Sequence, residues 1–164
     1  MVVKKRILLI SILATLIFSC STTDEEALRE STYLLHRVGT TPINGIVTFR
    51  EINSQSVQVD VSLENTVEGI PFPAHLHFGT IGESGELAFR LNDVEGASGR
   101  STTVLNNVEL SSGDRFSYDL LETMNGSVKI HLNDSFLKNV AIASGNIGSN
   151  RNSATGGIAV CTGH

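Results

Sequence analysis

Apolar and polar residues alternate one by one along several short stretches of this chain, and this period of two most constrains its fold. Between residues 57 and 63, four aliphatic side chains alternate with Gln58, Asp60 and Ser62. Alternation of this kind is typical of a β-strand that has one face on a core and one face towards solvent. No segment has the length and the 3.6-residue period of a convincing amphipathic helix.

Similar stretches recur from Tyr33 onwards, and the polar run at residues 53–56 predicts a hairpin connection between two of them. After a strand-like entry segment at 33–36, the predicted strands cover residues 43–49, 57–63, 75–77, 87–91, 104–110, 116–120, 128–132, 140–143 and 158–161, of which 104–110 is the least regular. Some seven to nine short strands at regular spacing predict an all-β domain, either a Greek-key β-sandwich or a flattened barrel. We expect residues 33–164 to form this single domain.

The first twenty residues are typical of an export signal. Three cations at Lys4, Lys5 and Arg6 precede an apolar run of about a dozen residues, which is shorter than a membrane span. The run ends at Phe18-Ser19-Cys20, which resembles the lipobox of bacterial lipoproteins, although Phe18 departs from its usual pattern. The alternatives are a signal peptide that is cleaved elsewhere and a single anchor helix.

The lipobox resemblance implies a signal peptide over residues 1–19 and an acylated Cys20. The polar, acidic residues 20–32 would then form a tether, and the domain would be held by its lipid on the bacterial cell envelope, at the periplasmic or surface face of the outer membrane. Lipidation of Cys20 would leave Cys161, the other of the two cysteines, without an intramolecular partner. Cys161 is then most simply a buried apolar residue, and an intermolecular disulfide is the alternative.

The composition argues against one class of partner. The formal net charge is −5, and there is no Trp among the few aromatic residues. A nucleic-acid-binding protein needs a basic surface to neutralise phosphates, and one that binds single strands also uses aromatic stacking. We therefore expect no nucleic acid as a partner; the oligomeric state stays open.

Three histidines are the candidate metal ligands. His75 and His77 are two positions apart in a predicted strand, so their side chains share a face, about 6–7 Å apart at the backbone. His131 alternates with Val128, Ile130 and Leu132 in another predicted strand, on the face opposite these apolar residues. Three imidazoles with an open coordination position suit copper or zinc. The alternative for His75 and His77 is a half-buried strand whose two histidines face water.

Four motifs in order resemble the copper/zinc superoxide dismutases. Residues 45–51 resemble the first hairpin of that family, and Ala74–Gly79 resembles the segment that carries two copper ligands. Val128–His131 resembles the segment with a further copper ligand, and residues 143–149 resemble a Gly-Asn-Ala-Gly-Ser-Arg loop. The resemblance implies a β-sandwich that binds one copper ion through His75, His77 and His131, with superoxide as the substrate.

The chain also departs from that family. There is no histidine between Phe78 and Ile130, so the family's bridging and zinc-binding residues have no counterpart, and we expect no second, zinc site. Asn150 stands where the family has an arginine that guides the anion, and the adjacent Arg151 is implied in that role. Arg100 and Lys129 are other cations that could attract an anion.

A second resemblance is to chordin-type (CHRD) domains, which have an Ala-His-Ile-His-Gly-like motif. Residues 74–77, 82–91 and 125–131 fit their outline, including the missing zinc loop. This resemblance implies a noncatalytic binding module of the cell envelope for a small ligand or a metal. The sequence therefore leaves two functions open: a copper-only superoxide dismutase and a binding module without catalysis.

Overall fold

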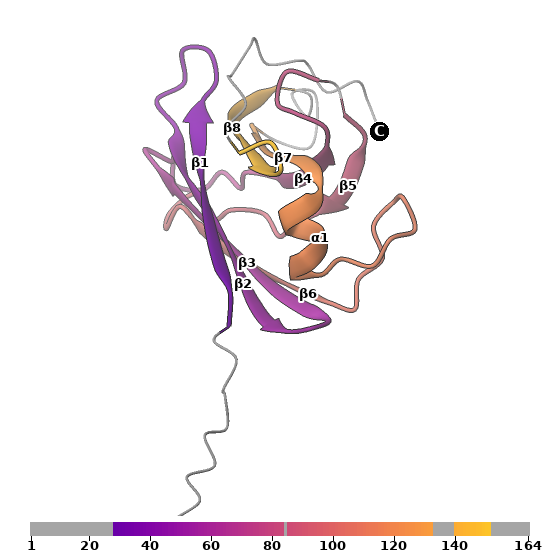
Figure 1. Ribbon diagram of the computed structural model, residues 1–164. Helices are drawn as coiled ribbons and strands as arrows, with labels where there is room; N and C mark the ends of the chain where they lie inside the picture. Colours follow the sequence, from indigo (N-terminus) through magenta and orange to yellow (C-terminus); the bar gives the residue numbers. More distant parts are fainter. Residues whose placement is uncertain (1–27, 84, 133–139, 152–164) are drawn as a thin grey trace, which may run out of the picture.

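The computed structural model describes residues 28–83, 85–132 and 140–151 (Figure 1). Its regular elements are eight antiparallel strands and one short helix, which confirms the all-β prediction. The elements are β1 (Glu30–Arg37), β2 (Asn44–Asn53), β3 (Ser56–Glu64), β4 (Ala74–Phe78), β5 (Leu87–Arg90), β6 (Arg100–Asn106), α1 (Tyr118–Thr123), β7 (Asn125–His131) and β8 (Ala141–Gly148). The predicted hairpin is present, with Ser54 and Gln55 between β2 and β3.

The strands form one continuous sheet in the order β5-β4-β7-β8-β1-β2-β3-β6, and this sheet curls strongly (Figure 1). β1 joins its two halves, because β1 pairs with β2 over six positions and with β8 at His36 and Arg37. The curl encloses an apolar core to which Phe49, Val59 and Leu76 contribute. Helix α1 contacts β8 and β2 and adds Tyr118 and Leu121 to this core.

The half of the sheet formed by β4, β7 and β8 is buried on both faces. One face carries Leu76, Val128 and Ile130 and belongs to the apolar core. Strand pairing places polar residues on the other face, and these are also buried: His75, His77, Ser127, Lys129, His131, Ser144 and Asn146. The alternation in the sequence therefore separates an apolar face from a polar face, but the polar face does not lie in solvent.

Two predicted elements are different in the structure. The alternation of Phe116, Tyr118 and Leu120 predicted a strand, but residues 118–123 form α1. Ser117 is the N-cap of this helix, and its hydroxyl accepts a hydrogen bond from the backbone N–H of Leu120 (3.2 Å). Residues 143–149 were expected to resemble a loop, but 141–148 form strand β8, and only the residues after Gly148 turn.

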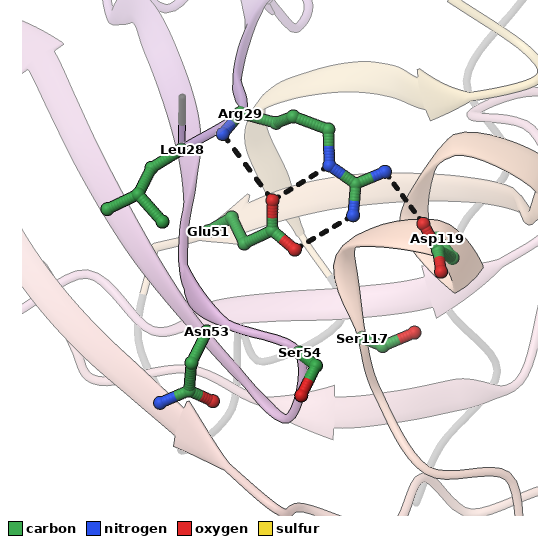
Figure 2. Close-up of a pocket in the computed structure, with 7 residues that line it drawn as sticks. All are labelled: Leu28, Arg29, Glu51, Asn53, Ser54, Ser117 and Asp119. Carbon is green, nitrogen blue, oxygen red and sulfur yellow. Dashed lines mark hydrogen bonds and ion pairs between the residues drawn. The ribbon is translucent and has the colours of Figure 1, made fainter. Parts of the chain in front are cut away.

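The folded structure begins before Tyr33, within the segment expected to be a tether. β1 starts at Glu30, and the Arg29 guanidinium donates two hydrogen bonds to the Glu51 carboxylate, both of 2.8 Å. A third hydrogen bond, of 2.7 Å, joins Arg29 to Asp119 of α1 (Figure 2). These contacts fasten the start of β1 to β2 and α1.

Predictions for the N-terminus concern residues outside the described part of the chain. The signal peptide over 1–19 and the acylated Cys20 belong to this group, as does Cys161 near the other end. In the described part, no helix has both the length and the apolar character needed to cross a membrane.

Candidate metal centre

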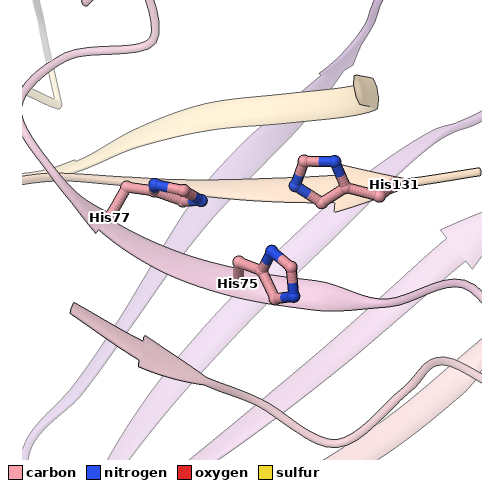
Figure 3. Close-up of side chains that lie close together, drawn as sticks. All are labelled: His75, His77 and His131. Atoms are coloured by element: carbon pink, nitrogen blue, oxygen red, sulfur yellow. The ribbon is translucent and has the colours of Figure 1, made fainter. Parts of the chain in front are cut away.

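The structure brings the three predicted ligands together on adjacent strands. His75 and His77 lie on β4 and His131 lies on β7, and the pairing of His75 with Lys129 puts His131 on the same face. Figure 3 shows the three rings facing one another from these two strands. The pairing of β7 with β8 has a register shift between Ile130 and His131.

The cluster is compact and buried. One ring nitrogen from each histidine lies within 4.8 Å of the other two. The exposed fractions are 8% for His75, 1% for His77 and 1% for His131. Metal–nitrogen bonds of about 2.0–2.1 Å in tetrahedral geometry require ligand nitrogens about 3.3 Å apart. The most widely spaced nitrogens would therefore have to approach one another by up to about 1.5 Å to close around an ion.

His77 has a hydrogen bond that assigns its tautomer. Its Nδ1 lies 3.0 Å from the carbonyl oxygen of Gly85 in the loop between β4 and β5. A carbonyl only accepts, so Nδ1 carries the proton and Nε2 is the nitrogen with a lone pair for a metal. Hydrogen bonds of this kind are typical around metal-binding histidines, because they fix the orientation of the ring.

The loop that carries Gly85 is itself held against the polar face. Lys129, which is 0% exposed, donates from its Nζ to the backbone oxygen of Glu83 (3.1 Å). At the near end of the loop, the backbone N–H of Ile81 donates to the Asn146 side-chain oxygen (2.8 Å). The loop, β7 and β8 thus together position the carbonyl that orients His77.

His75 accepts a hydrogen bond, whereas His77 donates one. In the pairing of β4 with β5, His75 lies across from Arg90, and the Arg90 Nη1 is 3.1 Å from the His75 Nε2. A guanidinium only donates, so Nε2 of His75 accepts and carries no proton. The sequence analysis missed Arg90, although its position in a predicted strand following the histidine strand was a usable signal for a hairpin partner.

The other predicted residues are placed as follows. Lys129 lies on the histidine face, between His75 of β4 and Ser144 of β8 in the strand pairing. Arg151 is exposed and follows the end of β8, where Gly148 pairs with Asn125; His131 lies at the opposite end of β7. The anion-guiding role of Arg151 stays a prediction, and Cys20 lies outside the described residues.

No protein-family model matches this chain, and neither does any curated protein or solved structure in the comparisons.

Proposed function

We propose that this protein binds one transition-metal ion through His75, His77 and His131. The observation that carries the proposal is the set of three buried imidazoles, whose ring nitrogens lie within 4.8 Å of one another. Imidazole is a common ligand of transition metals, so three ring nitrogens this close together could share one ion. The Gly85 carbonyl further supports the proposal, because it leaves Nε2 of His77 to face an ion.

Copper is the ion that we propose. The cluster has only nitrogen donors, and no carboxylate or thiolate joins it in the described part of the chain. Among divalent first-row metals, copper binds most tightly to a given nitrogen site, and imidazole suits it well. The resemblance to superoxide dismutases points to the same ion. Zinc is the alternative, since it also accepts three histidines with one open position.

Two functions follow from a bound copper ion. Copper supplies a one-electron couple, and superoxide dismutation uses it to convert two superoxide ions and two protons into oxygen and peroxide. The three histidines would hold the ion, and protons would come from solvent, since no further histidine joins the cluster among the described residues. The low exposure of His77 and His131, 1% each, favours the alternative of a noncatalytic binding module, because a substrate needs access.

Metal binding is tested by comparing His131→Asn with His36→Asn. His36 is an exposed histidine of β1 outside the cluster, so its replacement is a matched control. We expect the wild type and His36→Asn to bind one copper ion per chain in a chelator-competition titration. His131→Asn should bind copper at least about 100-fold more weakly than the wild type. Removing a residue that only hydrogen-bonds to a metal ligand already costs about 10- to 100-fold, and His131 is itself a proposed ligand. Circular dichroism checks that the variants fold, and a wild type without stoichiometric binding contradicts the proposal.

Catalysis is tested on the copper-loaded wild-type protein. Superoxide consumption is measured by pulse radiolysis against the metal-free protein and against free copper at the same concentration. Turnover that exceeds both controls and disappears in His131→Asn supports a dismutase. A fully loaded protein without turnover leaves the noncatalytic module.

We also propose that the protein is a lipoprotein of the bacterial cell envelope, anchored through Cys20. The support is the cationic start, the short apolar run and the lipobox-like end of this segment. Palmitate labelling and membrane fractionation test the anchor: Cys20→Ser should lose the label and leave the membrane fraction. Labelling that persists in this variant would contradict acylation at Cys20.

A further inference from the structure

Lys129 is a buried cation beside two of the three histidines. It lies across from His75 in the pairing of β4 with β7, where paired Cα atoms are about 4.5–5.5 Å apart. His131 follows two residues later on the same strand, about 7 Å away at the backbone. Lys129 is 0% exposed, and its ammonium donates to the backbone oxygen of Glu83 (3.1 Å). A positive charge is therefore enclosed next to the cluster.

No carboxylate neutralises this charge in the part of the chain that the structure describes. The ion pairs found there involve other cations, and none includes Lys129. Glu83 offers Lys129 only its backbone oxygen, because its carboxylate accepts a hydrogen bond from the backbone N–H of Thr80 (2.6 Å). The Arg90 guanidinium, 3.1 Å from Nε2 of His75, is a second cation, but it is exposed and water screens it.

The cluster itself supplies no negative charge either. Its three members are imidazoles, which bind metals in their neutral form, and no carboxylate or thiolate joins them among the described residues. Their exposed fractions are 8% or less, so little water reaches an ion held between them. The cost of burying an ion rises with its charge, and so does its repulsion from a nearby cation. Both effects oppose a divalent ion more than a monovalent one.

We propose that this centre holds copper as Cu⁺, and that the buried charge of Lys129 sets its preference for Cu⁺ over Cu²⁺ and Zn²⁺. Of copper and zinc, only copper has a stable monovalent ion. A cuprous ion on three neutral imidazoles leaves the smallest net charge beside Lys129, and it needs no anion from solvent to offset it. This inference rests on the proposed metal-binding function and adds to it the oxidation state of the ion.

The oxidation state is tested on the wild-type protein by measuring its affinities for Cu⁺ and Cu²⁺ separately. Each ion is titrated against a chelator of known affinity, and Cu⁺ is handled without oxygen. We expect Cu⁺ to bind at least about 10-fold more tightly, which places the potential of the bound couple at least about 59 mV above that of aqueous copper. Equal affinities, or tighter binding of Cu²⁺, overturn the preference. A protein that binds neither copper ion nor Zn²⁺ instead overturns the proposed function itself.

The role of Lys129 is tested with Lys129→Met against Arg100→Met. Arg100 is exposed and begins β6, at the far end of the strand order, so its replacement removes the same charge away from the cluster. In Lys129→Met we expect the ratio of Cu⁺ to Cu²⁺ affinity to fall about 10-fold and the potential to fall by about 59 mV. Arg100→Met should match the wild type. Loss of the contact with Glu83 would weaken all ions alike, so the ratio isolates the charge.

A second variant keeps Lys129 in place and neutralises its charge. Ser144 lies across from Lys129 in the pairing of β7 with β8, and its hydroxyl has no hydrogen-bond partner among the described residues. Ser144→Asp should therefore lower the ratio of Cu⁺ to Cu²⁺ affinity, as Lys129→Met does, while Lys129→Arg should preserve it. Circular dichroism checks that each variant folds. A ratio that stays at the wild-type value in a folded Lys129→Met or Ser144→Asp protein overturns the role of Lys129.

Discussion

Lys129 illustrates what the alternation along β7 does and does not encode. It follows Val128 and precedes Ile130, so its side chain is on the face opposite the apolar core. A lysine at such a position would ordinarily lie in solvent, but this one is 0% exposed. Its ammonium donates to the backbone oxygen of Glu83, which offsets part of the cost of burying the charge. The residue thus helps to hold the loop that orients His77.

Gly145 is the residue that lets β8 approach β1. A Cβ atom built on Gly145 would lie 2.0 Å from the backbone oxygen of Leu34 and 3.3 Å from a methyl group of Leu35. Both residues belong to β1, which pairs with β8 at the neighbouring Ser144. Glycine is required here because the obstacle is backbone, which cannot move aside as a flexible side chain could.

We therefore predict that Gly145→Ala destabilises the protein by about 1–3 kcal/mol, the usual cost of overpacking. Urea denaturation followed by circular dichroism measures this change. The matched variant is Ser144→Ala at the adjacent position, where a Cβ is already present and the hydroxyl has no hydrogen-bond partner in the described part of the chain. Ser144→Ala should stay close to the wild type, and equal stability of both variants would contradict the steric argument.

Among the elements, α1 is the one for which the period of two in the sequence wrongly predicted a strand. Phe116 and Tyr118 are both buried, as a strand with period two would require. Leu121, three residues after Tyr118, is also buried, which fits a helical turn. A six-residue helix offers too few positions to separate the two periods. The Ser117 hydroxyl and the packing of Tyr118 and Leu121 against the sheet select the helix.

The same helix takes part in the ion-pair network around Arg29. The Glu51 carboxylate raises the pKa of the Arg29 guanidinium, chiefly through their hydrogen bonds, and Asp119 of α1 adds to this effect. In turn, the hydrogen bonds from Arg29 lower the pKa of the Glu51 carboxyl below its ordinary value of 4.5. The Arg29 guanidinium also lies 4.7 Å from the centre of the Tyr118 ring. Three elements thus meet at Arg29.

This network predicts a pH dependence of stability. Because the pKa of Glu51 is lower in the folded than in the unfolded protein, its contribution is fully present above about pH 4.5 and is lost as the pH falls through the folded-state pKa. We expect the melting temperature of Glu51→Gln to lie below that of the wild type at pH 7, and this difference to shrink below pH 4.

Thermal unfolding between pH 3 and pH 7 makes the measurement, with Glu109→Gln as the control. Glu109 is an exposed glutamate, and its replacement should shift the whole curve little. A gap between wild type and Glu51→Gln that stays constant across the range would contradict a role for ionised Glu51.

For the whole molecule, the curled sheet explains how a polar cluster becomes buried. The apolar face of β4, β7 and β8 closes over the core, and the loop between β4 and β5 is tied to the opposite face by Lys129 and Asn146. The cluster therefore depends on the register of two strand pairs and on the loop at the same time. An ion held by His75, His77 and His131 would link β4 to β7 through side chains as well as through the backbone.

Such a link predicts that metal binding stabilises the folded protein. At a free copper concentration 100 times the dissociation constant, the stabilisation is about 2.7 kcal/mol, which corresponds to a rise in Tm of roughly 10 °C. Differential scanning fluorimetry with and without copper makes the measurement, and a chelator should reverse the shift. The Tm of His131→Asn should not rise with copper. A wild-type Tm that changes with neither copper nor zinc would contradict a metal centre in the folded state.

Some residues of the fold and of the site were predictable from the sequence, whereas the hydrogen-bond partners of the histidines were not. The strand carrying Val57 to Leu63 and the common face of His75 and His77 were predictable, because alternation is a local property of extended backbone. The hydrogen-bond partners of His75 and His77 were not predictable from sequence spacing alone. Arg90 and the Gly85 carbonyl lie beside these histidines because β4 and β5 pair with a register shift between Leu76 and His77. That shift depends on loop conformation.

The sequence by itself determined that this chain is all-β, that three histidines lie on polar strand faces, and which apolar residues face a core. These are consequences of side-chain order along single strands. Only the tertiary structure decided that β4 lies beside β7, that the three rings meet, and that the polar face is buried. Strand order and register join residues more than fifty positions apart, and many pairings of similar strands satisfy the same alternation.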